Sequence, residues 1–535
     1  MVSGLLLSIL SSPAPATSTT QLGDGTEVRW TGAGGARPYL PIVINPSNAS
    51  GLSGHEVEAA VVEGLLSWQA ATGRSFAFDV WVGTEELWYP TSQEMDGYST
   101  VHFASRDPEA GLTGGQAGYT DLFYDTTTGS ILEADIVLND VSFFMTADPA
   151  AATYADEGLL GKTLYLGDVV THELGHLLGL GHTGVSSSTM FPGAWSEQTS
   201  LGCDDVLGIR ELYSPSDQGV LSGTVTIDRM GRWAAMEVSV VSLDRRTVVA
   251  AAFTDDNGQF AIRGLESGRY LVMAGPYLGD PAGLPAQLAE DFALPCDVSR
   301  GLAPGVVELA SGGGATVALT LECQGGIELL DARGTLESPT VLEPGEGQLA
   351  GGYRVETGAE GAWFLIPGIE GNLSIDVLSF SMFSPARVEA QLTDLDGIPL
   401  SARITHPLED RGDTSVWDTR LEAFGIDGDV LLHLESYFMP SASYPGNATF
   451  LDPNSFALIV GAVGEELWEA PAGCAPSDLS TYSTPGGYPA RSWQPAAATE
   501  GRGCAVGVGT GGSGLGVSLF GLLAYRRRRI LTPRG

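Results

Sequence analysis

Three histidines within eleven residues are the part of this sequence best suited to chemistry. The stretch from Thr171 to Gly184 reads THELGHLLGLGHTG. On a helix, His172 and His176 lie one turn apart on the same face, so both imidazoles can reach one metal ion about 2.0 to 2.1 Å away. The chain has only seven histidines, so this spacing favours a metal site over surface histidines placed by chance.

The third histidine requires the chain to turn. Gly179 allows the helix to end in a left-handed backbone conformation, which costs glycine little, and His182 can then approach the same ion. Three nitrogen ligands leave the fourth tetrahedral position to water, which is the arrangement of a catalytic zinc. We therefore predict one zinc ion held by His172, His176 and His182.

Glu173 follows the first histidine and is not needed as a ligand. It is placed to take a proton from the water on the metal and to hand it later to a leaving amine. Zinc lowers the pKa of that water to near 7 and polarises a carbonyl group. These residues predict hydrolysis of peptide bonds with Glu173 as the general base.

The elements around the motif indicate a mixed α and β unit over residues 24–214. Ser53 to Glu56 have the spacing of a helix capping box, and Val57, Val61, Leu65 and Trp68 recur at helical intervals as one buried face. Alternating or β-branched runs predict strands that pack on the helices. The strand candidates are 39–45, 76–83, 99–105, 117–125 and 131–140.

The pattern H-E-x-x-H-x-x-G-x-x-H resembles that of the metzincin zinc peptidases. Met190, in the run STMFP after His182, fits the methionine turn of that class and would form an apolar floor under the ligands. Thr183, Pro192 and the run DDVLGIRELY from 204 to 213 are similar to matrixins. The resemblance covers roughly residues 36 to 214 and implies a zincin fold and zinc-dependent endopeptidase activity.

The sequence also departs from the matrixin pattern. No cysteine precedes Cys203, so a cysteine switch cannot operate, and the histidines of a structural zinc are missing because His102 stands alone. Ala194 and Trp195 alter the wall of the pocket, so specificity is not carried over. Calcium is a second candidate cofactor, with ligands from Asp121, Asp125, Asp135 and Asp140.

The rest of the chain is rich in strands and turns. Residues 219–324 resemble a carboxypeptidase regulatory-like β-sandwich, on pieces such as Gly223-Thr224-Val225 and Gly268-Arg269-Tyr270. Residues 325–468 again alternate and predict a second β-sandwich. We therefore expect a multidomain protein, with an α+β metzincin catalytic domain followed by two all-β sandwich domains and a linker over 469–503.

Both ends of the chain predict export. Residues 1–20 resemble a signal peptide, but the usual positively charged first residues are missing. Either the true start of the chain is displaced or the signal is atypical. Residues 504–535 place a cysteine, an uncharged span and four arginines in order, which resembles a myxobacterial C-terminal sorting tag. A plain membrane anchor is the alternative, and both give a transient or lasting membrane contact. Among the five cysteines, we expect Cys296 to pair with Cys323.

Charge limits the partners. The formal net charge is -39, and such a surface repels nucleic acid. The leading hypothesis is a secreted or surface-displayed zinc endopeptidase that binds polypeptide along the strand edge near 117–124. The alternatives are a surface binding or adhesion protein that uses a zincin-like domain without cutting, and a metal-dependent hydrolase for another substrate.

Overall fold

The computed structural model describes the part of the chain that carries the metal-binding motif and most of the predicted strands. The described residues are 19–22, 26–83, 95, 97–107, 112, 116–153, 163–185, 187–192, 198–214, 219–276, 298, 301–303, 305–321, 335–344, 347–350, 362–378, 386–405, 418–438, 456–463, 474 and 524–530.

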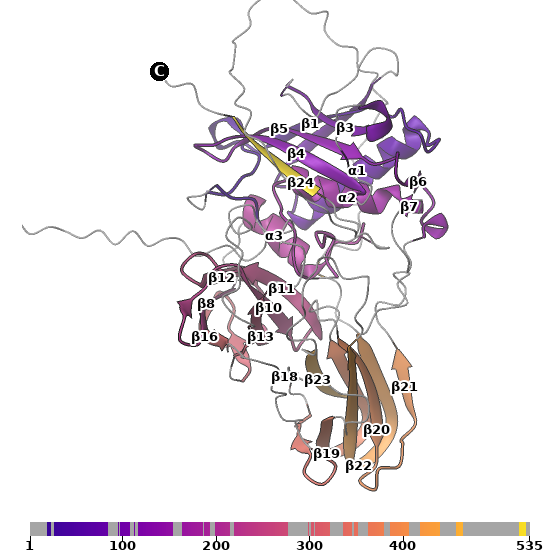
Figure 1. The fold of residues 1–535 in the computed structure, drawn as a ribbon, viewed down its shortest axis with the longest axis vertical. Coiled ribbons are helices and arrows are strands. Elements are labelled where there is room, and N and C mark those ends of the chain that lie inside the picture. The colour runs from indigo at the N-terminus through magenta and orange to yellow at the C-terminus, as the bar shows by residue number, and fades with distance from the viewer. Residues whose placement is uncertain are drawn as a thin grey trace, which may run out of the picture.

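The first part of the chain forms a twisted sheet with helices packed against it (Figure 1). Its strand order is β2, β1, β3, β5, β4, β24. β4 runs antiparallel to β5, and the other neighbours are parallel. The five predicted strands are confirmed, because β-branched and aromatic residues fit a buried pleated surface. The bounds are β1 Tyr39–Ile44, β2 Ala77–Val82, β3 Ser99–Phe103, β4 Gly118–Asp125, β5 Ile131–Leu138 and β24 Ala524–Ile530.

In the part of the chain that the structure describes, three α-helices accompany this sheet: α1 (Gly54–Ala71), α2 (Leu166–Leu177) and α3 (Cys203–Tyr213). The predicted capping box is confirmed, since Ser53 and Glu56 bond each other's backbone N–H at the start of α1. The predicted face of α1 is buried, and the Trp68 indole donates to the Thr171 carbonyl at 2.9 Å. α1 therefore fixes the position of α2, which carries the histidines.

Short elements complete this first part. Two strands, β6 (Phe144–Thr146) and β7 (Thr163–Tyr165), pair in parallel just before α2. The short 3-10 turns among the described residues are η1 Ala33–Gly35, η2 Ala104–Arg106 and η3 Pro149–Ala151.

The next strands form two sheets that share one hydrophobic core. The first sheet has the order β11, β10, β13, β14 with β15 paired to β13, and the second has β12, β8, β16 with β9 paired to β8. Residues of both sheets, including Val225 of β8 and Val238 of β10, belong to the same buried cluster. The bounds are β8 Gly219–Ile227, β9 Gly231–Arg232, β10 Met236–Ser242, β11 Thr247–Phe253, β12 Gln259–Leu265, β13 Gly268–Pro276, β14 Gly301–Leu302, β15 Val307–Leu309 and β16 Gly314–Leu321.

The last β-rich part is one sheet of seven strands within the described residues, where the sequence predicted a sandwich. Its long strands β19 and β22 change register near Gly368, Gly371, Gly425 and Gly428, all with positive φ. These glycines let the sheet bend around its own core. The bounds are β17 Thr340–Val341, β18 Gly347–Ala350, β19 Ala362–Leu378, β20 Ala386–Thr393, β21 Ala402–Thr405, β22 Thr419–Phe438 and β23 Phe456–Val463.

A disulfide and a buried ion network tie the parts together. Cys203 at the start of α3 is bonded to Cys474, 271 residues later and inside the predicted linker. This bond differs from the predicted pairing of Cys296 with Cys323, and those two cysteines lie outside the described residues. Asp376 of β19 contacts Arg246, from the turn between β10 and β11, and accepts from Arg420 of β22 at 2.6 Å.

The C-terminal arginine segment lies on the edge of the first sheet. β24 pairs in parallel with β4, with Arg526 opposite Asp121 and Arg529 opposite Tyr124 (yellow in Figure 1). Within the described residues, no helix is both long and apolar enough to span a membrane. The sorting tag or anchor predicted for 504–535 therefore stays a prediction.

We expect the Asp376→Ala variant to lower the free energy of unfolding by about 3 to 5 kcal/mol, because the Arg246 guanidinium would lose its carboxylate while its side chain is only 3% exposed. Calorimetry of the full chain measures this loss. Asp228→Ala is the matched control, since Asp228 pairs with Arg229 on the surface and should leave unfolding unchanged. Equal stability of both variants would contradict a stabilising role for the network.

Candidate metal centre

The three histidines converge on one point. His172 and His176 project from α2, and His182 follows the turn after that helix. The Nε2 atoms of His172 and His176 are 3.1 Å apart, and those of His176 and His182 are 3.2 Å apart. Among the described residues, these three histidines are the group whose ligand atoms lie close enough together, within 4.8 Å, to hold one metal ion.

Backbone carbonyls fix the tautomers of the first two imidazoles. The Nδ1 of His172 lies 2.6 Å from the Thr189 oxygen, and the Nδ1 of His176 lies 2.9 Å from the Leu180 oxygen. A carbonyl oxygen only accepts, so each Nδ1 must carry the proton and each Nε2 presents a lone pair. Two lone pairs about 3 Å apart repel each other unless a cation lies between them.

The spacing of these nitrogens fits zinc. Zinc–nitrogen bonds of about 2.05 Å in a tetrahedral site place two ligand nitrogens about 3.3 Å apart, close to the observed separations. Burial, together with the neighbouring His176, holds the pKa of His172 well below its usual value, despite the bond to Thr189. The imidazole is therefore neutral, which is the form that binds metal.

Glu173 lies beside the histidines with one oxygen held and one open. Its Oε2 accepts from the Thr120 hydroxyl of β4 at 2.7 Å. Its Oε1 is buried and has no hydrogen-bond partner among the described residues. Burial raises the pKa of this carboxyl to about 8, against the Thr120 bond, which lowers it. A buried acceptor without a donor is what a water molecule on a bound metal would satisfy.

Met190 packs beneath α2. Its side chain is 2% exposed, and a methyl group added to Gly175 would lie 2.2 Å from its sulfur. Asp205 of α3 holds this turn, because its carboxylate accepts the backbone N–H groups of Thr189 and Met190 at 2.7 and 3.0 Å. In the sequence, Asp205 stands only within the run that is similar to matrixins, and its place in the first turn of α3 was the one available signal.

The turn between the second and third histidines takes the predicted conformation. α2 ends at Leu177, and Gly179 has a φ of 101°. A side chain there would be strained and would also meet the Val28 carbonyl oxygen 2.2 Å away. The prediction for Gly179 is confirmed, and the contact with Val28 adds a second reason for glycine.

The other predicted ligands lie away from the histidines. Asp125 accepts backbone N–H groups of its own turn, and Asp140 accepts from Ser105 at 2.8 Å. Asp121 and Asp135 lie opposite each other on β4 and β5. Calcium binding by these aspartates stays a prediction. His102 bonds Thr100 and Asp107 in the interior. Ala194 and Trp195 lie outside the described residues.

A buried acid cluster lies next to the segment that follows His182. Asp204 accepts the Ala251 N–H at 2.9 Å and bonds the Thr183 side chain. Burial raises the pKa of Asp204 to about 8, against these two bonds, and the charges of Asp205 and Glu237 raise it further. Burial also raises the pKa of Asp205 to about 6, although three backbone N–H groups lower it.

Comparisons with known proteins agree with this site. Residues 47–214 match the family model described as Matrixin (Peptidase_M10). Metalloendoproteinase 1-MMP of Arabidopsis thaliana is 30% identical over 150 residues, which cover 25% of this chain and 39% of that protein. Metalloendoproteinase 2-MMP of Arabidopsis thaliana is 44% identical over 174 residues, which cover 31% of this chain and 40% of that protein.

Matrilysin of Rattus norvegicus is 58% identical over 48 residues, which cover 8% of this chain and 18% of that protein. The chain thus spans two fifths or less of the length of these relatives. The crystal structure of BcpA, the major pilin subunit of Bacillus cereus, aligns with 46% of this chain and 69% of its own, at 11% identity. Its TM-score of 0.13 is too low to indicate a shared fold.

Asp204 predicts a pH dependence of stability. Between about pH 4 and pH 8 the folded chain keeps a proton on Asp204 that the unfolded chain has released, so stability falls as the pH rises through this window. An asparagine at this position has no such proton and keeps an oxygen for Ala251. In the metal-free Asp204→Asn variant, the midpoint of thermal unfolding should therefore fall less between pH 6 and 8. An unchanged slope would count against the raised pKa.

Proposed function

Because residues 47–214 form a matrixin domain, we propose that this protein is a secreted or surface-displayed zinc endopeptidase, with its zinc on His172, His176 and His182. The observation that carries the proposal is the convergence of three buried imidazoles, with Nε2 atoms 3.1 and 3.2 Å apart, beside a carboxyl oxygen that lacks a donor. The matrixin relatives named metalloendoproteinases support the same activity.

Different residues around the histidines have different roles in the proposed hydrolysis. A zinc ion in this site acidifies water and polarises the carbonyl of the bond to be cut. Glu173 takes up a proton at Oε1 and returns it to the leaving amine, while the Thr120 hydroxyl holds Oε2 and so orients the carboxyl group. Gly118 brings β4 against this carboxyl, because a methyl group there would lie 2.9 Å from Oε1.

β4 also offers the substrate a backbone edge. An extended polypeptide can add to an exposed strand through main-chain hydrogen bonds, and β4 begins beside Glu173. β24 pairs with this edge in the structure. A polypeptide that binds along β4 therefore takes the place of β24.

The full chain should hydrolyse an unfolded protein, and the activity should be lost with a zinc chelator. Glu173→Ala should lower kcat by about 10²- to 10⁴-fold, the usual contribution of a general base, while zinc content stays unchanged. Glu63→Ala, an exposed glutamate of α1, is the matched control. A folded, zinc-loaded chain that cuts nothing would replace this proposal with the binding-protein alternative.

We also propose that export leaves Thr19 and Thr20 on the mature protein. Both residues are buried, and the Thr20 N–H donates to the Gly179 carbonyl at 2.8 Å, so a cut after residue 20 would remove a contact at the metal site. The small residues around Ala14 and Ala16 precede this contact. N-terminal sequencing of exported protein should give a start at or before Thr19, and a start at Gln21 or later would refute the proposal.

A further inference from the structure

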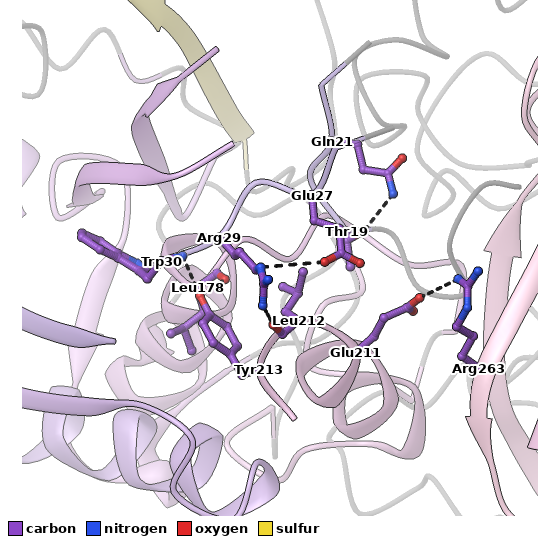
Figure 2. A network of polar contacts seen from close by, with 10 residues as sticks. All are labelled: Thr19, Gln21, Glu27, Arg29, Trp30, Leu178, Glu211, Leu212, Tyr213 and Arg263. Atoms are coloured by element: carbon purple, nitrogen blue, oxygen red, sulfur yellow. Dashed lines mark hydrogen bonds and ion pairs between the residues drawn. The ribbon is translucent and has the colours of Figure 1, made fainter. Parts of the chain in front are cut away.

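The loop from Leu178 to Val185, here called the His182 loop, carries the third histidine between two segments that lie outside residues 47–214. On one side is the N-terminal arm, defined here as Thr19–Leu22 with Thr26–Trp30 (Figure 2). On the other side are β10 and β11.

The N-terminal arm satisfies carbonyls that the end of α2 leaves open. The Trp30 indole donates to the Leu177 oxygen at 2.8 Å, and the Thr20 N–H donates to the Gly179 oxygen at 2.8 Å. Between them, the Leu178 oxygen accepts from the Tyr213 hydroxyl. That hydroxyl in turn accepts the backbone N–H of Trp30 (Figure 2). The last carbonyls of a helix need partners outside it, and here the arm supplies or orients them.

β10 and β11 hold the opposite side of the loop. Glu237 of β10 is 2% exposed and lies against Gly184, where an added methyl group would be 1.8 Å from Oε1. Thr183 bonds Asp204, which in turn accepts the Ala251 N–H of β11. Val185 packs in a buried cluster with residues of the two later β-rich parts: Val241, Leu243, Val248, Ala251, Leu271, Met273, Leu378 and Ile459.

We propose that the N-terminal arm and the β10–β11 face are positioning elements of the metal centre. Trp30 is the positioning residue of the arm, and on the other side the His182 loop is positioned by the close packing of Gly184 against Glu237 of β10. The inference rests on the proposed function in one respect, namely that His172, His176 and His182 hold the metal. In this arrangement, β10 and β11, which lie outside the matrixin-like residues 47–214, help to position the third histidine.

His182 needs positioning elements that the other two histidines do not need. His172 and His176 share a buried helix, which holds them once α2 is packed. His182 lies beyond the end of that helix, in a loop that is neither helix nor strand, and a free loop must lose conformational entropy before it can bind a metal. Contacts with the arm and with β10 meet that cost during folding, so the third nitrogen is in place before the ion arrives.

The decisive test introduces a steric clash between the His182 loop and β10 in the full chain, and then removes it with a second substitution. Gly184→Ala drives a methyl group into Glu237, so zinc affinity should fall by about 10-fold or more, the range found when partners of metal ligands are lost. Glu237→Ala in the same chain removes the clash and should restore most of the affinity. Competition with a chelating dye measures zinc affinity, and the visible spectrum of bound Co²⁺ reports the loss or return of the third nitrogen.

One control and one further variant complete the test. Gly314→Ala, whose added methyl group meets nothing closer than 3.7 Å, should keep the parent affinity. Trp30→Phe keeps an aromatic ring but removes the indole donor to Leu177 together with part of the buried ring, and it should weaken zinc binding with the same change in the Co²⁺ spectrum.

An unchanged affinity in Gly184→Ala, or a loss that Glu237→Ala does not relieve, would overturn the inference. Metal affinity is measured without substrate. A chain that passes these tests and cuts no protein would therefore refute the proposed function alone.

Discussion

The metal centre depends on two backbone carbonyls that dictate where the protons of two imidazoles lie. The oxygens of Thr189 and Leu180 each take an Nδ1–H, and this leaves the Nε2 lone pairs of His172 and His176 facing one another. The surrounding structure keeps those two oxygens in place. Asp205 bonds the backbone on either side of the Thr189 carbonyl, and Leu180 follows the Gly179 turn that the N-terminal arm contacts. Electrostatic repulsion between nitrogens is thereby built into the fold and is relieved by a cation.

Local patterns in the sequence predicted the parts of this centre that depend on local geometry. The histidine spacing, the buried face of α1 and the positive φ at Gly179 all follow from helix periodicity and glycine sterics, which a few consecutive residues determine. The contacts that complete the centre join residues far apart in the chain. Glu237 against Gly184 and Trp30 on Leu177 depend on how whole elements pack, and neither residue type carries a spacing that would reveal it.

The same difference explains the β-rich parts. Alternation predicted strands over 219–324 and 325–468, because a half-buried strand has a period of two. It could not predict that the later strands would form one bent sheet, since four glycines with positive φ set that bend. Nor could it place Asp376 between Arg246 and Arg420, which joins neighbouring parts through an ion network in the interior.

The disulfide between Cys203 and Cys474 closes a covalent ring that contains both β-rich parts. A single proteolytic cut at a turn between these two cysteines would nick the chain inside the ring. Such a nick opens the ring but leaves the fragments joined, so the helix that holds the methionine turn stays attached to the far end of the β-rich region. In an oxidising medium, a single internal cut in the ring would therefore leave the molecule at its full mass.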